Sequence, residues 1–555
     1  MRVLGVNSET APNNDRQRSQ CRYAGRSNRH VLNDMTWRRS NVLVMLTVAL
    51  TLMFSSARPN AAEGHLNVLH IIVDDLRPAL GCHGDPIAKT PAIDRLAKRG
   101  VQFDNAYVQY PICGPSRASF LSGLRPQTSG YFGWEFPPDA TLMPTWFRQN
   151  GYFTAAFGKV FHQHHVLYMP PDKIQMLKPP GAWDATDLCT TEDDPCGYGY
   201  LYSVALRPEN PQAAKHVLAR GSVRPQGLKG GWFWQEWSET DLPDERTTDG
   251  IIVRRAVEAI KQASREGKPF YIAAGMRRPH QLLAAPKRYF DLYPLDSVPF
   301  PAAEPRDHLK AIPALALNYD KSRAYSIYFD DGRQKLWRAY YANVSFVDAQ
   351  VDILLQALDK LDLWKNTVVV LHSDHGWHLG EHGGLCNKDT LFDESTHTPL
   401  IIAAPGVGGT GTSCPHPTEL VDLFPTLADL CKLEPPAHLD GVSLKTSLEN
   451  PRGTAPRTGA ISVVQRHLQG NKGKGFCPVW MTLEKNTGVP RRVLGRSVRS
   501  ENWRYTEWDG GQLGIELYDV SNDPRELNNL ASYGRYAEIQ NRLHSLLREL
   551  DPTAR

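Results

Sequence analysis

Four short apolar runs along the chain end abruptly in polar side chains. They lie at residues 66–75, 152–162, 269–280 and 366–378 and are rich in Val, Ile, Ala and Phe. Apolar runs of this length without strict alternation are typical of strands buried on both faces of a parallel sheet. We therefore expect four buried strands, each followed at its carboxyl end by charged or histidine side chains.

Amphipathic segments between these runs predict helices. Apolar positions recur with helical spacing at 92–99, 247–264 and 339–360. Strands that alternate with helices favour an open α/β sheet. Ligands bind such a sheet just beyond the carboxyl ends of its strands. The four polar clusters are therefore expected to meet in one site, although they are scattered along the chain.

Two segments lack this regularity. Residues 170–245 are rich in Pro, Gly and Trp and include GGWFWQEW at 230–237, and residues 290–335 are Pro-rich. Loops over the site entrance are one interpretation of the first segment, because binding loops often lie over a rigid scaffold. Aromatic padding of a peripheral core is the other interpretation. Neither segment contains a motif that identifies a substrate.

The pattern changes in the last part of the chain. Residues 497–508 and 514–520 predict antiparallel strands, and 535–549 predicts a final helix. We expect a smaller C-terminal α+β subdomain at 455–555, packed on a catalytic domain at 63–454.

The N-terminal segment has the features of an export signal. Arg38 and Arg39 precede an apolar run from Val42 to Phe54, and small residues follow, with cleavage expected after Ala57 or Ala62. This order of features is typical of a secretory signal peptide. The run is shorter than the ~20 residues of a transmembrane helix. We expect an exported protein without a membrane span in its mature form, with an uncleaved anchor as the alternative.

Removal of this segment changes the charge balance. Residues 1–34 are polar and Arg-rich, unlike the start of a signal peptide, so we expect translation to begin at Met35 and residues 1–62 to form the extension and signal. The first 62 residues contain nine arginines and three acidic residues, which leaves 54 basic and 56 acidic residues in the rest. That balance gives no indication of nucleic-acid binding.

The chain contains nine cysteines. Export would permit disulfides. Cys189 and Cys196 lie close together in a loop-like stretch and form the first candidate pair, and Cys414 with Cys431 forms the second. The sequence does not fix the connectivity.

Two of the four strand ends are acidic. Asp74 and Asp75 end the first run, and Asp374 and His375 end the last. Adjacent carboxylates repel each other unless a cation neutralises them. Mostly oxygen ligands suit Ca²⁺ or Mg²⁺ better than zinc. These residues therefore predict one metal ion, whereas an isolated Asp-Asp pair would more simply begin a turn.

The other two strand ends are basic. Lys159 and His162 follow the second run and His280 the third, and we expect Arg117 and Lys388 at the same rim. A metal ion surrounded by Lys, Arg and His suits a tetrahedral oxyanion such as a sulfate or phosphate ester. Taken singly, each of these residues has a plain alternative as a surface or ion-paired side chain.

A cysteine stands at the start of a further predicted helix, in PICGPSRASFLSG at 111–123. The free N–H groups and the dipole of a helix N-terminus favour negative charge at Cys113. Arg117 lies one turn along the same face. A thiolate nucleophile would use these groups. It would not need a metal with hard oxygen ligands beside it.

This stretch resembles the signature of the type I, formylglycine-dependent sulfatases. Their Cys-x-Pro-Ser-Arg, followed by Leu-Thr-Gly, is matched from Cys113 to Gly123, with Ser122 in place of Thr. The resemblance implies that a formylglycine-generating enzyme oxidises Cys113 to formylglycine. One hydroxyl of the hydrated aldehyde would attack sulfur and displace the alcohol. The other would then lose its proton, so that sulfate leaves and the aldehyde reforms.

The resemblance alone implies the other roles. One Ca²⁺ ion would be held by Asp74, Asp75, Cys113, Asp374 and His375. The remaining catalytic residues would be Lys159 and Lys388 on the sulfate oxygens, Arg117 on the diol, and His162 and His280 on the diol and the leaving oxygen. A one-residue gap in EHGGLCNKDT leaves Asn387 as the alternative to Lys388.

The spacing within three motifs is similar to that of the iduronate-2-sulfatase group. These motifs are GKVFH at 158–162, RRPH at 277–280 and SDHGWHLGEHG at 373–383, with Arg278 in place of the usual lysine of Lys-Pro-His. The resemblance implies an alkaline-phosphatase-like sandwich with a large mixed, mostly parallel sheet and a smaller C-terminal subdomain. The implied substrate is a sulfated polysaccharide or oligosaccharide, cut at a sulfated uronic acid. The alternatives are a phosphonate or phosphate ester hydrolase of the same superfamily, and a non-catalytic glycan-binding protein with unmodified Cys113.

Overall fold

A computed structural model describes most of the chain beyond residue 64. The described residues are 65–133, 140–162, 183–187, 217–223, 235–299, 304–305, 307–317, 332–468, 476–478 and 491–554. Ala61–Arg555 form one compact unit. The predicted signal peptide, the start at Met35, the boundary at residue 62 and the Cys189–Cys196 pair lie outside the described residues and stay predictions.

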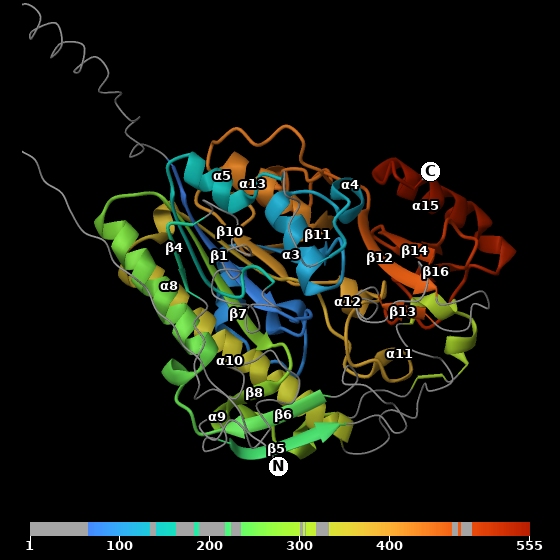
Figure 1. The fold of residues 1–555 in the computed structure, drawn as a ribbon, viewed down its shortest axis with the longest axis horizontal. Helices are drawn as coiled ribbons and strands as arrows, with labels where there is room; N and C mark the ends of the chain where they lie inside the picture. Colours follow the sequence, from blue (N-terminus) through green and yellow to red (C-terminus); the bar gives the residue numbers. More distant parts are fainter. Residues whose placement is uncertain are drawn as a thin grey trace, which may run out of the picture. The chain divides into compact units, whose positions relative to one another are not determined.

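The centre of this unit is a mixed, mostly parallel sheet (Figure 1). Within the described residues its strand order is β11-β2-β10-β9-β1-β7-β3-β4. β1 runs parallel to β7 and β9, whereas β10 runs antiparallel to β9 and β2. The strands are β1 (Asn67–Asp74), β2 (Val101–Tyr107), β3 (Phe153–Gly158), β4 (Ala185–Asp187), β7 (Phe270–Pro279), β9 (Thr367–Ser373), β10 (Leu400–Ala403) and β11 (Thr412–Glu419). The four strands expected from the apolar runs and the α/β class are confirmed.

Helices cover both faces of this sheet. Alternate residues of each strand point to opposite faces and so pack against different helices. Leu69, Ile71 and Val73 of β1 pack in one core cluster, and Val68 and Ile72 pack in another. The first cluster includes residues of α2 (Pro91–Arg99), α8 (Thr248–Arg265) and α10 (Gly332–Lys360), and the second includes residues of α3 (Cys113–Ser122), α5 (Met143–Gln149) and α13 (Leu423–Leu430). Among the described helices, none is long and apolar enough to cross a membrane.

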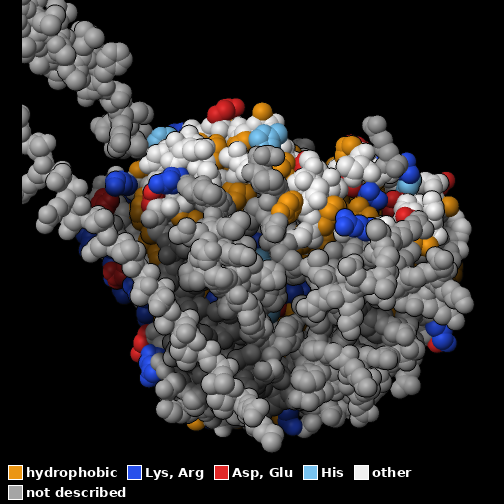
Figure 2. Space-filling model, viewed as in Figure 1, with side chains coloured by type: hydrophobic (Ala, Val, Ile, Leu, Met, Phe, Trp, Pro, Cys, Tyr) orange, Lys and Arg blue, Asp and Glu red, His pale blue; other side chains and the backbone are white. Residues whose placement is uncertain are grey.

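The surface carries charges of both signs. In the face drawn in Figure 2, described acidic and basic side chains are interspersed with polar and apolar ones. This distribution agrees with the near-equal numbers of basic and acidic residues beyond the N-terminal segment.

A second, small sheet is formed by strands that precede and follow β7 in the sequence. It has the order β5-β6-β8 and consists of β5 (Val217–Val223), β6 (Gln235–Thr240) and β8 (Leu283–Pro286). The expectation of irregular loops throughout 170–245 is therefore wrong for β4, β5 and β6. Trp237 on β6 packs against the core shared with α8 and α10, which supports core padding at that position.

The C-terminal part forms an antiparallel sheet with the order β13-β12-β14-β15-β16. Its strands are β12 (Ala460–Leu468), β13 (Phe476–Pro478), β14 (Arg491–Arg499), β15 (Trp503–Trp508) and β16 (Ile515–Asp519). Leu543 and Leu547 of α15 (Ala537–Leu550) share a core with β14 and β15. The α+β character is confirmed, whereas the boundary at residue 455 stays a prediction because both sheets belong to one compact unit.

The segment that precedes α3 joins the two sheets. The backbone N–H of Val463 on β12 donates to the carbonyl of Gln109 at 2.9 Å. The N–H of Gln465 donates to the hydroxyl of Tyr110 at 3.0 Å. The loop that leads into Cys113 is therefore fixed by the C-terminal sheet.

Cys414 on β11 and Cys431 after α13 are buried free thiols. The second candidate disulfide pair is therefore wrong. Both side chains pack in the same apolar cluster, where free cysteine behaves as a small hydrophobic residue.

Candidate active site

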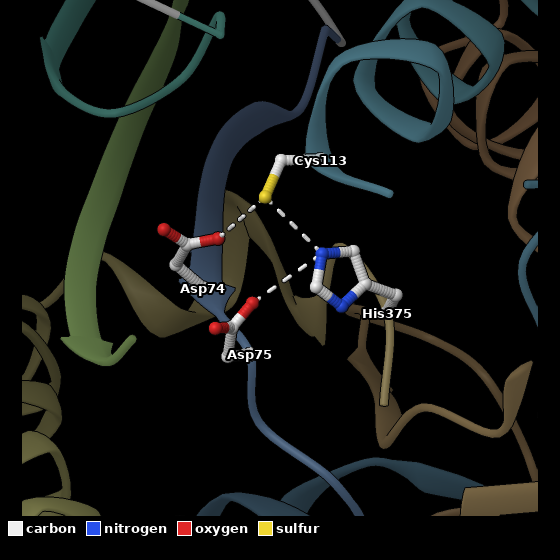
Figure 3. A group of neighbouring side chains, drawn as sticks. All are labelled: Asp74, Asp75, Cys113 and His375. Atoms are coloured by element: carbon white, nitrogen blue, oxygen red, sulfur yellow. Dashed lines mark hydrogen bonds and ion pairs between the residues drawn. The ribbon is translucent and has the colours of Figure 1, made fainter. Parts of the chain in front are cut away.

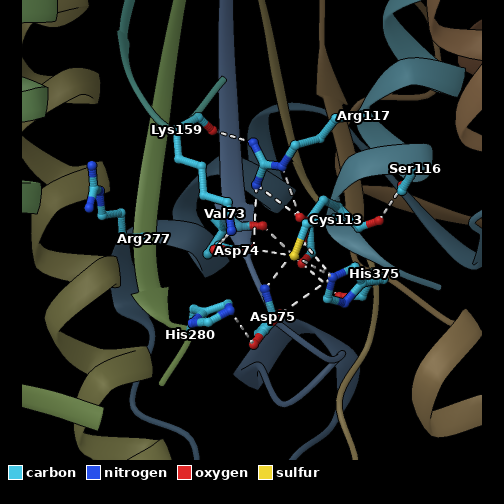
Figure 4. Close-up of polar contacts among 12 residues, drawn as sticks. Val73, Asp74, Asp75, Cys113, Ser116, Arg117, Lys159, Arg277, His280 and His375 are labelled. Atoms are coloured by element: carbon cyan, nitrogen blue, oxygen red, sulfur yellow. Dashed lines mark hydrogen bonds and ion pairs between the residues drawn. The ribbon is translucent and has the colours of Figure 1, made fainter. Parts of the chain in front are cut away.

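The polar ends of β1 and β9 meet at the N-terminus of α3, as Figures 3 and 4 show. β1 ends at Asp74 and β9 ends one residue before Asp374. The Sγ atom of Cys113 lies 3.4 Å from Oδ1 of Asp74 and 3.2 Å from Nε2 of His375. Adjacent parallel strands thus bring together residues that are distant in the sequence.

Four of the predicted metal ligands form a compact buried group. Donor atoms of Asp74, Asp75, Cys113 and His375 all lie within 4.8 Å of one another. Asp374 lies beside them: its Oδ1 is 3.6 Å from Nε2 of His375 and accepts the backbone N–H of Asp75 at 3.2 Å. All five expected ligands are therefore gathered in one place.

The hydrogen bonds of His375 suit a metal ligand. Its Nδ1 lies 2.9 Å from the carbonyl oxygen of Gly376, which can only accept, so Nδ1 carries the proton. Burial lowers the pKa of His375 to about 3, which keeps the ring neutral. Its Nε2 lone pair then faces Oδ1 of Asp75 at 3.4 Å. A cation between these two atoms would stabilise both, and a backbone contact of this kind orients metal-bound histidines.

A bound cation would also stabilise the ionised form of Asp75. Burial raises the pKa of Asp75 to about 8; Lys388 opposes this shift, and Asp74 and Asp374 add to it. Oδ2 of Asp75 is buried without a hydrogen-bond partner. A divalent cation would stabilise the ionised carboxylates. Three carboxylates are hard oxygen donors of the kind that Ca²⁺ and Mg²⁺ prefer, so the residues fit such an ion.

Asp74 is ionised by its cationic neighbours. Burial favours its protonated form, but Lys159, Arg117 and Lys388 outweigh burial and hold the pKa of Asp74 well below its ordinary value. The ammonium of Lys159 donates directly to Oδ2 of Asp74. The end of β1 therefore presents a carboxylate already paired with a cation.

Arg117 bridges three elements beneath Cys113. It is fully buried, and its Nε donates to Oδ2 of Asp374 at 2.9 Å. Its Nη2 lies 3.5 Å from Oδ1 of Asp74, and its Nη1 donates to the carbonyl of Lys159. The guanidinium thus connects the ends of β1 and β9 with the segment after β3. Its predicted contact with a diol stays a prediction.

The thiol of Cys113 is not activated as a thiolate. Burial and Asp74 raise its pKa, against the opposing effects of Lys159 and Lys388. The S–H donates to Oδ1 of Asp74. Since the thiolate is the nucleophilic form, the alternative of a plain thiolate nucleophile is disfavoured.

Lys388 reaches the same group from the segment after β9. Its Nζ lies 2.5 Å from Oδ1 of Asp75 and 3.0 Å from Sγ of Cys113. Burial works against its charge, but Asp75 and Cys113 raise the pKa of Lys388 above its ordinary value. The carbonyl of Asn387 accepts the N–H of His378. Of the two alternatives left open by the motif, Lys388 is the one whose ammonium contacts the cluster.

His280 faces the cluster as a proton acceptor. Its Nδ1 lies 2.6 Å from the carbonyl of Gln281, so Nδ1 carries the proton, and its Nε2 lies 3.7 Å from Oδ2 of Asp75. Burial lowers the pKa of His280 well below its ordinary value. His162 is buried three residues after Lys159, and its role stays a prediction.

The decisive comparison is with protein families. The family model described as "Sulfatase" matches residues 66–433. This chain belongs to the sulfatase family. The matched range begins just before β1 and includes Cys113, both lysines and all five predicted ligands.

Several relatives are similar to this sulfatase over most of their length. It is 29% identical to "Iduronate 2-sulfatase" of Mus musculus, over 92% of this chain and 98% of the relative. It is 30% identical to "Iduronate 2-sulfatase" of Homo sapiens, over 88% and 95% of the two chains. It is also 30% identical to "Sulfatase" of Formosa agariphila, over 88% and 87%.

Solved structures share the fold of this sulfatase at lower identity. Phosphonate monoester hydrolase of Agrobacterium radiobacter superposes with a TM-score of 0.68 at 23% identity, over 88% of this chain and 96% of the other. A 2-O GAG sulfatase superposes with a TM-score of 0.60 at 22% identity, over 88% and 92%. These similarities confirm the alkaline-phosphatase-like architecture expected for a sulfatase.

Some residues of the sulfatase site carry no role in the sequence-based prediction. The hydroxyl of Ser116 donates to the carbonyl of Asp374 at 2.5 Å, and the hydroxyl of Tyr340 donates to the carbonyl of Asp75 at 2.8 Å. Ser116 lies inside the signature, so its position was the available signal. Tyr340 lies in the first third of α10 and has no such signal.

Proposed function

We propose that this sulfatase is exported and hydrolyses sulfate esters of polysaccharides or oligosaccharides at a sulfated uronic acid. The reaction uses a formylglycine made from Cys113 and one Ca²⁺ ion. The observation that carries this proposal is the position of Sγ of Cys113, in contact with Asp74, His375 and Lys388 at a helix N-terminus. The similarity to two proteins named iduronate 2-sulfatase supports the uronic acid.

The proposed groups supply chemistry that the unmodified side chains lack. A formylglycine would supply a hydrated aldehyde as the nucleophile, and Ca²⁺ bound by the aspartates and His375 would polarise a sulfate oxygen. The other contributions come from the chain itself.

The lysines bind the anion. Nζ of Lys388 lies 3.0 Å from Sγ of Cys113, and Lys159 and Arg117 both reach Asp74. These three cations balance the three aspartates of the cluster. A divalent ion then makes the site positive, which favours a sulfate ester. Lys159 and Lys388 would each donate to oxygens of the sulfate.

The histidines move the protons. Nε2 of His280 is an acceptor that faces Asp75, while Nδ1 is held by the carbonyl of Gln281. It can therefore accept the proton of an attacking hydroxyl. His162 and His280 are the two candidates for the hydrogen bond to the leaving oxygen.

Mass spectrometry of the tryptic peptide that ends at Arg117 tests the modification. In protein from the native host we expect the lower mass of formylglycine at Cys113; intact thiol alone would refute the mechanism. Cys113→Ala should reduce kcat/KM by roughly 10³-fold or more, as expected when a nucleophile is removed. Cys431→Ala, which also truncates a buried free cysteine, should keep the wild-type rate.

A panel of sulfated disaccharides tests the substrate. We expect hydrolysis of disaccharides that carry a sulfated uronic acid and little hydrolysis of disaccharides sulfated only on the hexosamine. The reverse preference would refute the uronic acid. Faster hydrolysis of 4-nitrophenyl phosphate than of 4-nitrophenyl sulfate would favour the phosphate ester alternative.

A further inference from the structure

A buried arginine of the C-terminal sheet, Arg466, donates hydrogen bonds to Asp389, the residue next to Lys388. Nη1 of Arg466 on β12 donates to Oδ1 of Asp389 at 3.0 Å, and its Nη2 donates to the backbone carbonyl of Asp389. Arg466 is fully buried and Asp389 is 3% exposed. One planar guanidinium therefore holds both the side chain and the main chain of Asp389, a geometry that arginine allows and lysine does not.

The backbone of Asp389 needs such a contact. Its φ angle is +73°, in the left-handed region that residues other than glycine rarely adopt. This conformation persists only where the surroundings hold it. The N–H of Asp389 donates to the carbonyl of Pro111 at 3.0 Å, two residues before Cys113. Arg466 and Pro111 thus both hold the backbone of this turn.

Arg466 is itself held rigidly. Its Nε donates to the carbonyl of Leu315 at 3.3 Å, and its guanidinium lies 5.7 Å from the ring centre of Trp508. The N–H of the preceding residue, Gln465, donates to the hydroxyl of Tyr110. The same strand therefore fixes the loop before Cys113 and the turn after Lys388.

We propose that Arg466 is a positioning residue for Lys388. It sets the turn at Asp389 so that the ammonium of Lys388 stays beside Cys113, and it does not contact the substrate. This inference rests on the proposed function, in which Lys388 binds the sulfate. A lysine side chain has several rotatable bonds, so its placement depends on a fixed backbone. A shift of about 1 Å in such a group costs roughly 100-fold in rate.

A double-mutant cycle tests the proposal. Arg466→Lys keeps the charge but cannot make both contacts with Asp389. It should lower kcat/KM for 4-nitrophenyl sulfate about tenfold in the wild-type background and less than about twofold in the Lys388→Ala background, because coupled residues are not additive. A general loss of stability would give the same factor in both backgrounds.

A second measurement does not depend on turnover. The shift in melting temperature on adding inorganic sulfate should be smaller in Arg466→Lys and in Lys388→Ala than in the wild type. It should be no smaller in the double variant than in Lys388→Ala alone. Asp389→Asn, whose side chain tolerates the left-handed region, should show the same pattern as Arg466→Lys and replaces it if that variant does not fold.

Arg504→Lys is the matched control. Arg504 on β15 is also buried but pairs with Glu526 and Asp393. Its substitution should change kcat/KM by the same factor in both backgrounds. An equal factor for Arg466→Lys in both backgrounds, or no loss at all, would overturn the inference. Unchanged kcat/KM in Lys388→Ala alone would instead overturn the proposed role of Lys388.

Discussion

At the scale of single residues, Asp75 adopts a left-handed backbone conformation at the centre of the site. Its φ angle is +61°, its N–H donates to Asp374, and its carbonyl accepts from Tyr340. Successive side chains of an extended strand point to opposite faces. The left-handed turn at Asp75 instead lets two consecutive carboxylates, those of Asp74 and Asp75, face the same group of donors.

Asp75→Asn should weaken metal binding without unfolding the protein. Asparagine tolerates the left-handed region, whereas the loss of one carboxylate charge should reduce Ca²⁺ affinity by roughly 100-fold. Calorimetric titration of CaCl₂ into chelator-treated protein measures this change. Asp362→Asn, at an exposed aspartate with a φ angle of +53°, is the control and should bind as the wild type does. Equal affinity in the Asp75 variant would contradict the assignment of this ligand.

The residues that the sequence identified are those marked by both type and position. Cys113 and Arg117 stand in a signature, and Asp74 and Asp374 end apolar runs. Arg466 could not be found in this way. It contacts Asp389 across 77 positions of the chain, and no pattern in the sequence indicates such a contact.

At the scale of elements, the close approach of β3 and β7 sets the position of Lys159. The N–H of Lys159 donates to the carbonyl of Gly275 at 2.7 Å. A Cβ atom on Gly275 would lie 2.2 Å from the carbonyl carbon and oxygen of Lys159. The two strands can therefore approach this closely only with glycine at position 275.

Gly275→Ala should push Lys159 away from Asp74. We expect the free energy of unfolding, measured in urea, to fall by about 1–3 kcal/mol, the usual effect of overpacking. We also expect kcat/KM to fall, because the ammonium of Lys159 is displaced. Gly534→Ala is the control, since no atom lies within 4 Å of its added Cβ. Wild-type stability and rate in Gly275→Ala would show that the strands can separate without consequence.

Elements with a strong apolar pattern were predicted, and those without one were not. β1 and β9 are buried along their whole length. The start of α10 was placed too late, because its first turns, GRQKLWR, are mostly polar. β5 and β6 carry charged and polar residues, VLARGSV and QEWSET, so neither strand gave an apolar run.

At the scale of the whole molecule, partly buried ion pairs include one that connects the C-terminal sheet to the segment after β9. Oε2 of Glu394 lies 3.3 Å from Nε2 of His382, and Arg504 of β15 pairs with Asp393 at 2.8 Å. Burial favours the protonated form of Glu394, but His382, His378 and Arg77 outweigh burial and lower the pKa of Glu394 to about 2.

These pairs should make the protein sensitive to acid. The unfolded chain binds the proton of Glu394 near pH 4.3, above the pKa of the folded state. The stability contributed by Glu394 is therefore present above about pH 4.3 and is lost as the pH falls towards about 2. The melting temperature should fall between about pH 5.5 and about pH 3 less steeply in Glu394→Gln than in the wild type. The exposed Glu538→Gln should follow the wild type, and equal slopes in all three proteins would contradict the role of Glu394.

The hydrogen bonds from Arg466 to Asp389 have a consequence for the point in synthesis at which the site is complete. When the ribosome has released the chain only as far as β11, Asp74, Cys113 and Lys388 are already outside it. β12, the strand that fixes the turn beside Lys388, has not yet emerged. The chain emerges from its N-terminal end during synthesis, and contacts between distant positions form slowly. We therefore expect a nascent or truncated chain that lacks β12 to contain every reacting group and yet to remain inactive until its last strands arrive.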